Sequence, residues 1–441
     1  MVRALALAVL VSTAALAQEA PASAPAGQRL TLDAAIQLAL QRNPDLQRQV
    51  LLSRSSEQDQ VLARSAILPS LGVNASYTDT RQGGGVTYLQ NVPIPQPTQV
   101  AHNWQASATL RQLVFDGGKW WNNLDAANLG RAASAALVDE QRLQITYLVE
   151  QRFYELVRTQ RQLAVLADAA ARSRDQADFT QRLFDGGRAT QADVYAARAN
   201  RDNDEVNRLG QERNVELART DLALAIGVDP GEPLTVAEPP RLMDDPSPPP
   251  PAKDAIARAL EARPSLKAAG FTVESNRKAA SAAGGDFWPS VSLAAGYQRA
   301  TRDLSTMFSD PTLNSTLYGS VNLSWNVFGG FATSANARKA EIQTLLSEND
   351  LQNARRNVAS DVQKAVAQLG TARAQARVAQ QSEQTAKEGL RLARTRQEVG
   401  VGTQLEVRDA ELKLTQAQLS VVGSLVDGRE AEAALRRAQG G

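Results

Sequence analysis

Residues 391–414 read RLARTRQEVGVGTQLEVRDAELKL and mark the turn of a long helical hairpin. The chain around this turn, residues 328–437, contains no proline. At about 1.5 Å per residue, a helix over residues 331–397 would be roughly 100 Å long, about three times the diameter of a small domain. Glycines then interrupt the helix within residues 399–403, and a second helix is expected to return from Gln404. A hairpin of this length is predicted to form the wall of an elongated structure.

The returning helix carries two apolar stripes on nearly opposite sides. One stripe steps by three and four residues and the other by seven. They consist of Val407, Ala410, Leu414, Ala417 and Val421, and of Leu405, Leu412, Leu419 and Val426. The alternative is a helix buried in a thick bundle, but Arg408 and Lys413 lie between the stripes and disfavour it. The two stripes therefore indicate a helix with a neighbour on each side, like a stave in a barrel.

The first 17 residues have the features of a secretory signal peptide. Arg3 precedes an apolar run over residues 4–11, and residues 15–17 form a small-x-small cleavage site before Gln18. The apolar run is too short for a transmembrane anchor, which needs about 20 residues. We therefore expect residues 1–17 to be removed and the protein to be exported. The 48 basic and 47 acidic residues leave no charge excess that would favour nucleic acid as a partner.

The rest of the chain is a tandem duplication. Positions near the beginning recur 220 residues later, and positions near the first hairpin recur 213 residues later. The pairs at the first spacing are Ala35 and Ala255, Ala39 and Ala259, Pro44 and Pro264, Leu46 and Leu266, and Tyr77 and Tyr297. Those at the second are Phe115 and Phe328, Gly187 and Gly400, Thr190 and Thr403, and Val194 and Val407. The change of spacing places the net length difference in a loop between Tyr77 and Val114.

Proline punctuates this duplication and predicts the domain organisation. The first repeat, residues 18–228, is expected to hold short helices, two strands and a hairpin over residues 118–227. The second repeat, residues 253–441, has the same order and a hairpin over residues 331–437. A proline-rich linker over residues 229–252 joins the two.

Two segments with alternating polarity precede each hairpin. The four predicted strands cover residues 70–81, 103–115, 289–301 and 316–328. Each is about as long as a tilted membrane strand, with polar residues on one face. A soluble sandwich has the same period, but the export signal, the tryptophans near strand ends and the long helices favour the membrane. We expect Val321 and Leu323 to face lipid, and Asn322 and Ser324 to face a lumen.

Four strands cannot close a barrel, because the smallest membrane barrels have about eight. An open sheet in lipid would leave backbone groups at its edges without hydrogen bonds. Several chains are therefore expected to contribute strands to one barrel. The predicted fold class is a mixed α/β membrane protein.

The duplicated pattern resembles the TolC-type outer-membrane efflux proteins, the outer membrane factor family. The resemblance rests on LVFDGG at residues 113–118, on Gly400-x-x-Thr403-x-x-Glu406-Val407-x-x-Ala410, and on the order of such motifs in both repeats. It covers essentially the whole mature chain. It implies a homotrimer with a twelve-stranded β-barrel in the outer-membrane lipid, continued by a periplasmic α-barrel of twelve helices, with the linker in an equatorial belt. It also implies an exit duct for an efflux or type I secretion system, with an inner-membrane pump and a periplasmic adaptor protein as partners.

The resemblance also implies an acidic ring at the periplasmic entrance. Two acids three residues apart after the second hairpin turn match Glu406 and Asp409, and the acid after the first turn matches Asp193. The family's gate further uses a tyrosine and an arginine, whose positions are occupied here by Gln397 and Gly402. This latch is therefore expected to be absent or built differently in this chain.

The hairpin turns match the tips that adaptor hairpins touch in the family. The matching residues are Gly186, Gly187, Gly400, Gly402 and Thr403. A glycine that ends a helix and reverses the chain also has a local reason, because such positions favour positive φ. The residues leave both explanations open.

Little in the sequence supports catalysis. One histidine and no cysteine cannot supply a transition-metal cluster. The glycines at residues 83–85 and 117–118 are not followed by the Gly-Lys-Ser/Thr of a phosphate loop. We expect no enzyme activity and no cofactor. The alternative to a duct is a periplasmic coiled-coil scaffold or adaptor without a pore, which explains the helices but leaves the strands without a role.

Overall fold

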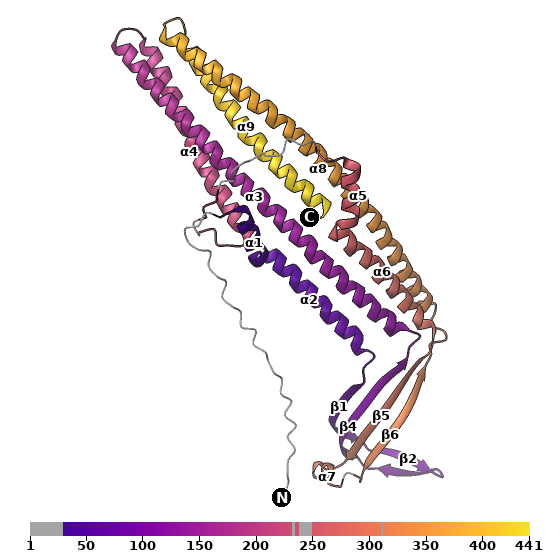
Figure 1. Ribbon diagram of the computed structural model, residues 1–441. Coiled ribbons are helices and arrows are strands. Elements are labelled where there is room, and N and C mark those ends of the chain that lie inside the picture. The colour runs from indigo at the N-terminus through magenta and orange to yellow at the C-terminus, as the bar shows by residue number, and fades with distance from the viewer. Residues whose placement is uncertain (1–29, 232–233, 238–248, 311) are drawn as a thin grey trace.

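The computed structural model describes residues 30–231, 234–237, 249–310 and 312–441. The expected signal peptide, residues 1–17, and most of the expected linker lie outside the described residues. Figure 1 shows an elongated molecule with two helical hairpins at one end and a β-sheet at the other. The mixed helical and β organisation expected from the sequence is confirmed.

Nine α-helices are found among the described residues. They are α1 (Leu32–Arg42), α2 (Pro44–Ser65), α3 (Lys119–Asp185), α4 (Gln191–Ile226), α5 (Ala252–Ala262), α6 (Pro264–Gly284), α7 (Leu304–Met307), α8 (Ala332–Glu398) and α9 (Gln404–Gln439). The strands are β1 (Ser70–Gln82), β2 (Gly85–Leu89), β3 (Val92–Gln96), β4 (Gln99–Phe115), β5 (Ser290–Thr301) and β6 (Ser315–Ser324). A short 3₁₀ helix, η1 (Gly285–Phe287), precedes β5.

The two long helices α3 and α8 have 67 residues each and run most of the length of the helical part. Each is paired with two shorter helices placed one after the other. Along α3 these are α4 near the tips and α2 near the sheet, and along α8 they are α9 and α6 (Figure 1). The 22 residues of α2 and the 36 of α4 together nearly match the length of α3.

Asn43 holds the junction between the two short helices of the first repeat. Its Oδ1 accepts a hydrogen bond from the Asp45 N–H at 2.9 Å and so caps α2, while its Nδ2 donates to the Ala225 carbonyl of α4 at 2.8 Å. Gly227 ends α4 with φ +83°, and a Cβ there would lie 2.8 Å from the Arg42 carbonyl oxygen. A side chain at residue 227 would therefore push the two helices apart.

The second repeat has Arg263 at the position equivalent to Asn43. Arg263 is buried and forms an ion pair with Glu140 of α3, with 3.3 Å between Nη2 and Oε1. The other Glu140 oxygen, Oε2, accepts from the Ser265 N–H at 3.1 Å, so a carboxylate from the first repeat caps α6 of the second. Asn43 thus makes contacts within the first repeat, whereas Arg263 at the equivalent position connects the second repeat to the first.

The apolar core follows the middle of the long helices. Around α3 the fully buried side chains include Ile145, Val149, Phe153 and Leu156, which pack with α1 and the end of α4. A second cluster joins α8 to α5 and the end of α9 through Val362 and Leu435. Among the described residues, no helix is both long enough and apolar enough to cross a membrane.

Four strands form one antiparallel sheet in the order β1-β4-β5-β6. Its register separates the side chains into two faces, because directly paired residues point to the same side. The apolar face carries Leu71, Val73, Ala75, Tyr77, Trp104, Ala106, Ala108, Leu110, Val291, Leu293, Ala295, Tyr297, Leu317, Val321 and Leu323. The polar face carries Ser70, Asn74, Ser76, Gln105, Ser107, Thr109, Arg111, Ser292, Gln298, Thr316, Tyr318, Ser320, Asn322 and Ser324.

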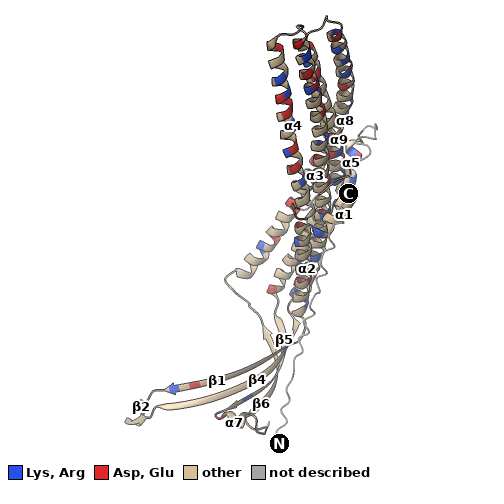
Figure 2. Ribbon diagram, turned by 90° about the vertical axis from the view of Figure 1, so that its left-hand side faces the viewer, with Lys and Arg blue, Asp and Glu red and all other residues tan. Residues whose placement is uncertain are grey.

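Both outer strands of this sheet have an unpaired edge. β1 pairs only with β4, and β6 pairs only with β5. The apolar face is uncovered as well, with Val321 and Leu323 exposed to 70% and 68% in the single chain. Figure 2 shows charged residues along the helices and few of them in the sheet.

The structure corrects the bounds of the predicted strands, and β4 begins at Gln99, four residues earlier than expected. The strand expected over residues 316–328 ends at Ser324, which pairs with Ser290, the first residue of β5. Residues 325–328 therefore have no partner strand, and the Trp325 indole donates to the Phe287 carbonyl at 3.2 Å instead. In the first repeat, the length difference expected in a loop forms the hairpin of β2 and β3, whose turn residues Gln90 and Asn91 have φ of 49° and 66°.

Candidate functional site at the hairpin tips

The two hairpins turn in the same way at their tips. After α3, the Arg188 N–H donates to the Leu183 carbonyl at 2.7 Å, and after α8, the Val401 N–H donates to the Arg396 carbonyl at 3.0 Å. These bonds span five residues, as in the Schellman helix end. A threonine, Thr190 or Thr403, then caps the returning helix. The repeats thus present two similar turns side by side at the end of the molecule farthest from the sheet (Figure 1).

The four tip glycines do not share one explanation. Gly187 and Gly400 have φ of +70° and +81°, so helix termination accounts for them. Gly402 is not in this region, but a Cβ there would lie 2.8 Å from the Gln397 nitrogen and 2.9 Å from the Arg396 carbonyl carbon. Gly186 has φ −86° and room for a Cβ. Positive φ therefore accounts for Gly187 and Gly400 but not for Gly186 and Gly402.

Asp193 has a local structural role at the start of α4. Its Oδ2 accepts hydrogen bonds from the Thr190 N–H at 2.9 Å and the Thr190 hydroxyl at 2.7 Å, and the Asp193 N–H donates to Thr190 Oγ1 at 3.2 Å. This is a capping box. The hydrogen bonds from the Thr190 hydroxyl and N–H lower the pKa of the Asp193 carboxyl below its ordinary value.

Glu406 and Asp409 lie in one groove between α8 and α9, and each has a basic neighbour. The Arg396 Nε lies 3.5 Å from Glu406 Oε2, and the Lys413 Nζ lies 2.6 Å from Asp409 Oδ2. All four side chains are well exposed, so these ion pairs are screened by water and salt. Asp193 lines a different groove, between α4 and α9. Within one chain the structure therefore brings two of the three expected acids together.

Gln397 and Gly402 lie against each other where α8 ends. Gly402 sits against the end of α8, and its N–H donates to the Arg396 carbonyl at 2.9 Å. The Gln397 side chain has its Nε2 buried without a hydrogen-bond partner among the described residues. A polar contact between the two hairpins lies deeper along them.

A buried charged cluster makes this contact deeper in the hairpins. Arg408 of α9 forms a two-pronged ion pair with Asp204 of α4, with Nη1–Oδ2 at 2.7 Å and Nη2–Oδ1 at 3.0 Å. The side chains are 18% and 10% exposed. On the same side of α9, Glu411 is 4% exposed and pairs with Arg394 of α8 at 2.9 Å. Arg172 of α3 completes the cluster by donating to the Thr415 hydroxyl at 3.0 Å.

This cluster is not among the sites predicted from the sequence, although the sequence carries a signal for it. The buried positions of α4 include Ala197, Asp204, Gln211 and Ala218, each seven residues apart, so an acid occupies a heptad position that is alanine at both ends of this run. Arg408 lies between the two apolar stripes of α9, as the sequence indicates, but its guanidinium pairs with Asp204 of another helix. A charge at a core heptad position is the pattern that indicates such a buried partner.

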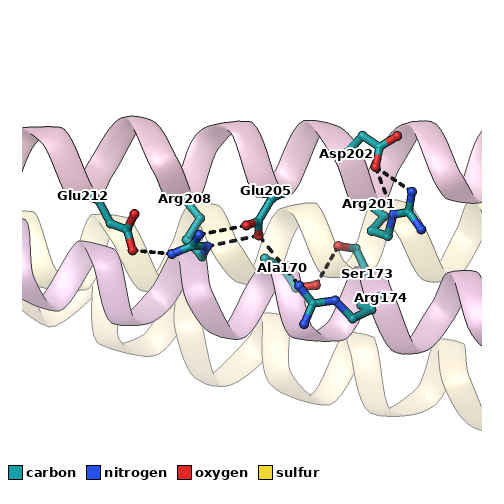
Figure 3. Close-up of polar contacts among 8 residues, drawn as sticks. All are labelled: Ala170, Ser173, Arg174, Arg201, Asp202, Glu205, Arg208 and Glu212. Atoms are coloured by element: carbon teal, nitrogen blue, oxygen red, sulfur yellow. Dashed lines mark hydrogen bonds and ion pairs between the residues drawn. The ribbon is translucent and has the colours of Figure 1, made fainter.

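The outer surface of the first hairpin carries an ion-pair ladder instead (Figure 3). Arg208 lies between Glu205 and Glu212 of the same helix, and Arg174 of α3 approaches Glu205 to 3.9 Å. The hydrogen bond from Arg208 is the main cause of a lowered pKa at the Glu205 carboxyl. All four residues belong to the first hairpin, so these ion pairs do not join the two hairpins.

Both repeats of the chain match one known protein family. Residues 35–228 and 255–441, one segment per repeat, match the family described as outer membrane efflux protein. Outer membrane protein OprJ of Pseudomonas aeruginosa is 25% identical over 418 residues, which are 92% of this chain and 83% of OprJ.

Solved structures with the same fold include two outer-membrane proteins. The outer membrane protein VceC of Vibrio cholerae matches with a TM-score of 0.80 at 21% identity, over 93% of this chain and 96% of VceC. The CmeC outer membrane channel of Campylobacter jejuni matches with a TM-score of 0.80 at 18% identity, over 93% of this chain and 85% of CmeC.

Proposed function

The chain belongs to the outer membrane efflux protein family, and from this membership we propose that three copies assemble into one duct through the outer membrane and the periplasm. The protein is thus an outer-membrane exit duct, and not an enzyme. Family members serve efflux and secretion systems together with other components. A periplasmic scaffold without a pore, the alternative from the sequence, leaves the two-faced sheet unexplained.

The observation that carries the trimer is the sheet with its two unpaired edges. Its apolar face suits lipid and its polar face suits a water-filled lumen. The free edges of β1 and β6 need hydrogen-bond partners in a membrane, and another copy of the chain supplies them. Three copies of four strands give a closed barrel of twelve strands, which is wide enough to leave a channel.

The helices continue the duct into the periplasm. Each chain contributes two long helices and two stacked pairs of shorter ones, and each stacked pair counts as one helix in cross-section. Three copies therefore form a tunnel with twelve helices in its wall. The hairpin tips then lie at the far end, where a periplasmic adaptor and an inner-membrane pump are expected to dock. In this proposal the adaptor contacts Gly186, Gly187, Gly400, Gly402 and Thr403. Gly186 supports it most, because no local constraint requires glycine there.

The entrance of this tunnel is the proposed position of Glu406 and Asp409. Three copies give about six carboxylates around one constriction, and acidic rings of this kind attract cations. Arg396 and Lys413 accompany the carboxylates and weaken their field. Asp193 contributes less, because its carboxylate is engaged with Thr190 in the first turn of α4.

Ion conduction through the purified protein in a planar bilayer tests both the duct and the entrance. We expect the double variant Glu406→Gln, Asp409→Asn to lower the permeability ratio of K⁺ to Cl⁻ about twofold at 10 mM salt, where charges act over about 30 Å. Block by multivalent cations should weaken with it. The matched variant Arg396→Gln, Lys413→Gln removes the basic neighbours and should raise the same ratio.

The two variants together separate an entrance ring from acids that are merely solvated at a helix start. If the acids lie away from the ion path, neither variant changes selectivity or block, and the ring is refuted. If the wild-type protein forms no conducting channel in the bilayer, the duct itself is refuted.

A further inference from the structure

The polar face of the sheet contains a single charged residue. Among the residues of β1, β4, β5 and β6 on this face, the side chains are serine, threonine, asparagine, glutamine, small apolar residues, Leu113 and Tyr318, apart from Arg111. The other charged residues of these strands, Asp79, Arg81 and Arg299, have the opposite parity and lie on the apolar face. Arg111 is therefore the only fixed charge that these strands direct toward the lumen of the proposed barrel.

Arg111 sits at the end of the sheet that meets the helices. It pairs with Ser70, the first residue of β1, and with Ala294 of β5. The residue is exposed, and its guanidinium makes no hydrogen bond or ion pair with any described residue. By contrast, Arg299 is buried, and its guanidinium donates to the Thr306 and Ser309 carbonyls. Arg299 therefore has a structural role, because it is buried and hydrogen-bonded. Arg111 has neither property.

We propose that the three Arg111 side chains of a trimer form a ring of positive charge where the barrel meets the helical tunnel, and that this ring favours anions passing through the duct. The inference rests on the proposed trimeric duct. The strands place no other charge on this face, and Lys119 and Asp286 at the adjoining helix ends pair with each other, so the three guanidinium groups are the main source of the potential there. Carboxylates and phosphate-bearing compounds are the anions that a guanidinium binds best.

The proposed duct then carries two charged rings of opposite sign in series. The entrance carboxylates favour cations, and the Arg111 ring favours anions some distance further along the same path. A substrate with both charges meets an attractive ring at each end of the tunnel. Ions of a single sign meet one attractive and one repulsive ring, so the wild-type channel is expected to discriminate weakly between K⁺ and Cl⁻.

Single-channel selectivity in planar bilayers tests the ring. We expect Arg111→Gln to raise the permeability ratio of K⁺ to Cl⁻ about twofold at 10 mM salt and to have almost no effect at 1 M, because the screening length falls from about 30 Å to about 3 Å. Arg111→Lys should retain the wild-type ratio. Arg81→Gln removes an arginine from the apolar face of the same sheet and should leave the ratio unchanged.

Cysteine labelling gives a second readout that does not depend on comparing separately folded variants. The chain has no cysteine, so Arg111→Cys introduces a single target. A positively charged methanethiosulfonate reagent added to the open channel should lower the ratio of K⁺ to Cl⁻, and a negatively charged one should raise it. Each change in the permeability ratio is measured in one channel before and after the reagent is added.

The outcomes distinguish this inference from the trimeric duct on which it rests. If the channels conduct but neither Arg111→Gln nor the charge of the label changes their selectivity, the arginine ring is refuted and the duct stands. If the wild-type protein forms no channel, the duct fails and the ring fails with it.

Discussion

Replacing Asp204 with alanine is expected to loosen the contact between the two hairpins and to speed amide hydrogen exchange near their tips about 100-fold. The substitution leaves Arg408 in a largely buried position without its carboxylate. Removing one partner of a buried ion pair costs about 3–5 kcal/mol, and we expect the lower end because Arg408 retains some exposure. About 3 kcal/mol corresponds to a change of roughly two orders of magnitude in the local opening equilibrium.

Hydrogen exchange followed by mass spectrometry locates the effect. Faster exchange is expected in residues 191–211 of α4 and residues 404–415 of α9, and unchanged exchange in residues 145–157, which lie in the core of α3. The double variant Asp204→Leu, Arg408→Met removes both charges and should recover most of the protection. Wild-type exchange rates in Asp204→Ala would mean that the ion pair does not hold the hairpins together.

The second large effect is expected at Leu323, on the apolar face of β6. An arginine there should destabilise the folded protein in a bilayer by about 2–4 kcal/mol if the residue lies near the bilayer midplane, because a cation would face lipid tails. Asn322 is the matched control. It is the neighbouring residue on the polar face, where its amide donates to Ser320 Oγ at 3.2 Å.

Urea titration of the protein refolded in lipid vesicles measures this difference. Leu323→Arg should shift the unfolding midpoint to lower urea, and Asn322→Arg should leave it nearly unchanged, because water in the lumen solvates the added charge. If Leu323→Arg is tolerated and Asn322→Arg lowers the midpoint instead, the face that carries Asn322 is the one that contacts lipid.

Much of this architecture is predictable because it rests on periodic patterns. The heptad positions Val407 and Leu414 are buried, and the alternation through Leu317 and Leu323 agrees with the register of β6. Such patterns arise because one side of each element must meet apolar surroundings along its whole length. The match in length between the long helices and the stacked short ones follows from the rise per residue alone.

The remaining details depend on contacts between distant parts of the chain. The alternating pattern continues through Trp325, but β6 ends at Ser324 because its partner strand begins at Ser290. The polarity of Arg408 predicts exposure, and only the position of Asp204 in the other hairpin reverses that expectation. The basic neighbours of Glu406 and Asp409, which alter how an acidic ring would act, likewise depend on side-chain conformations in the folded hairpin.

The central claim is that three chains share one barrel, and the mass of the detergent-solubilised protein tests it most directly. Light scattering corrected for bound detergent should give the mass of three chains, with the β signal in circular dichroism lost together with that mass on heating. A stable mass of one chain with its β signal intact would contradict the account, because four strands with two unpaired edges would then be stable without partners.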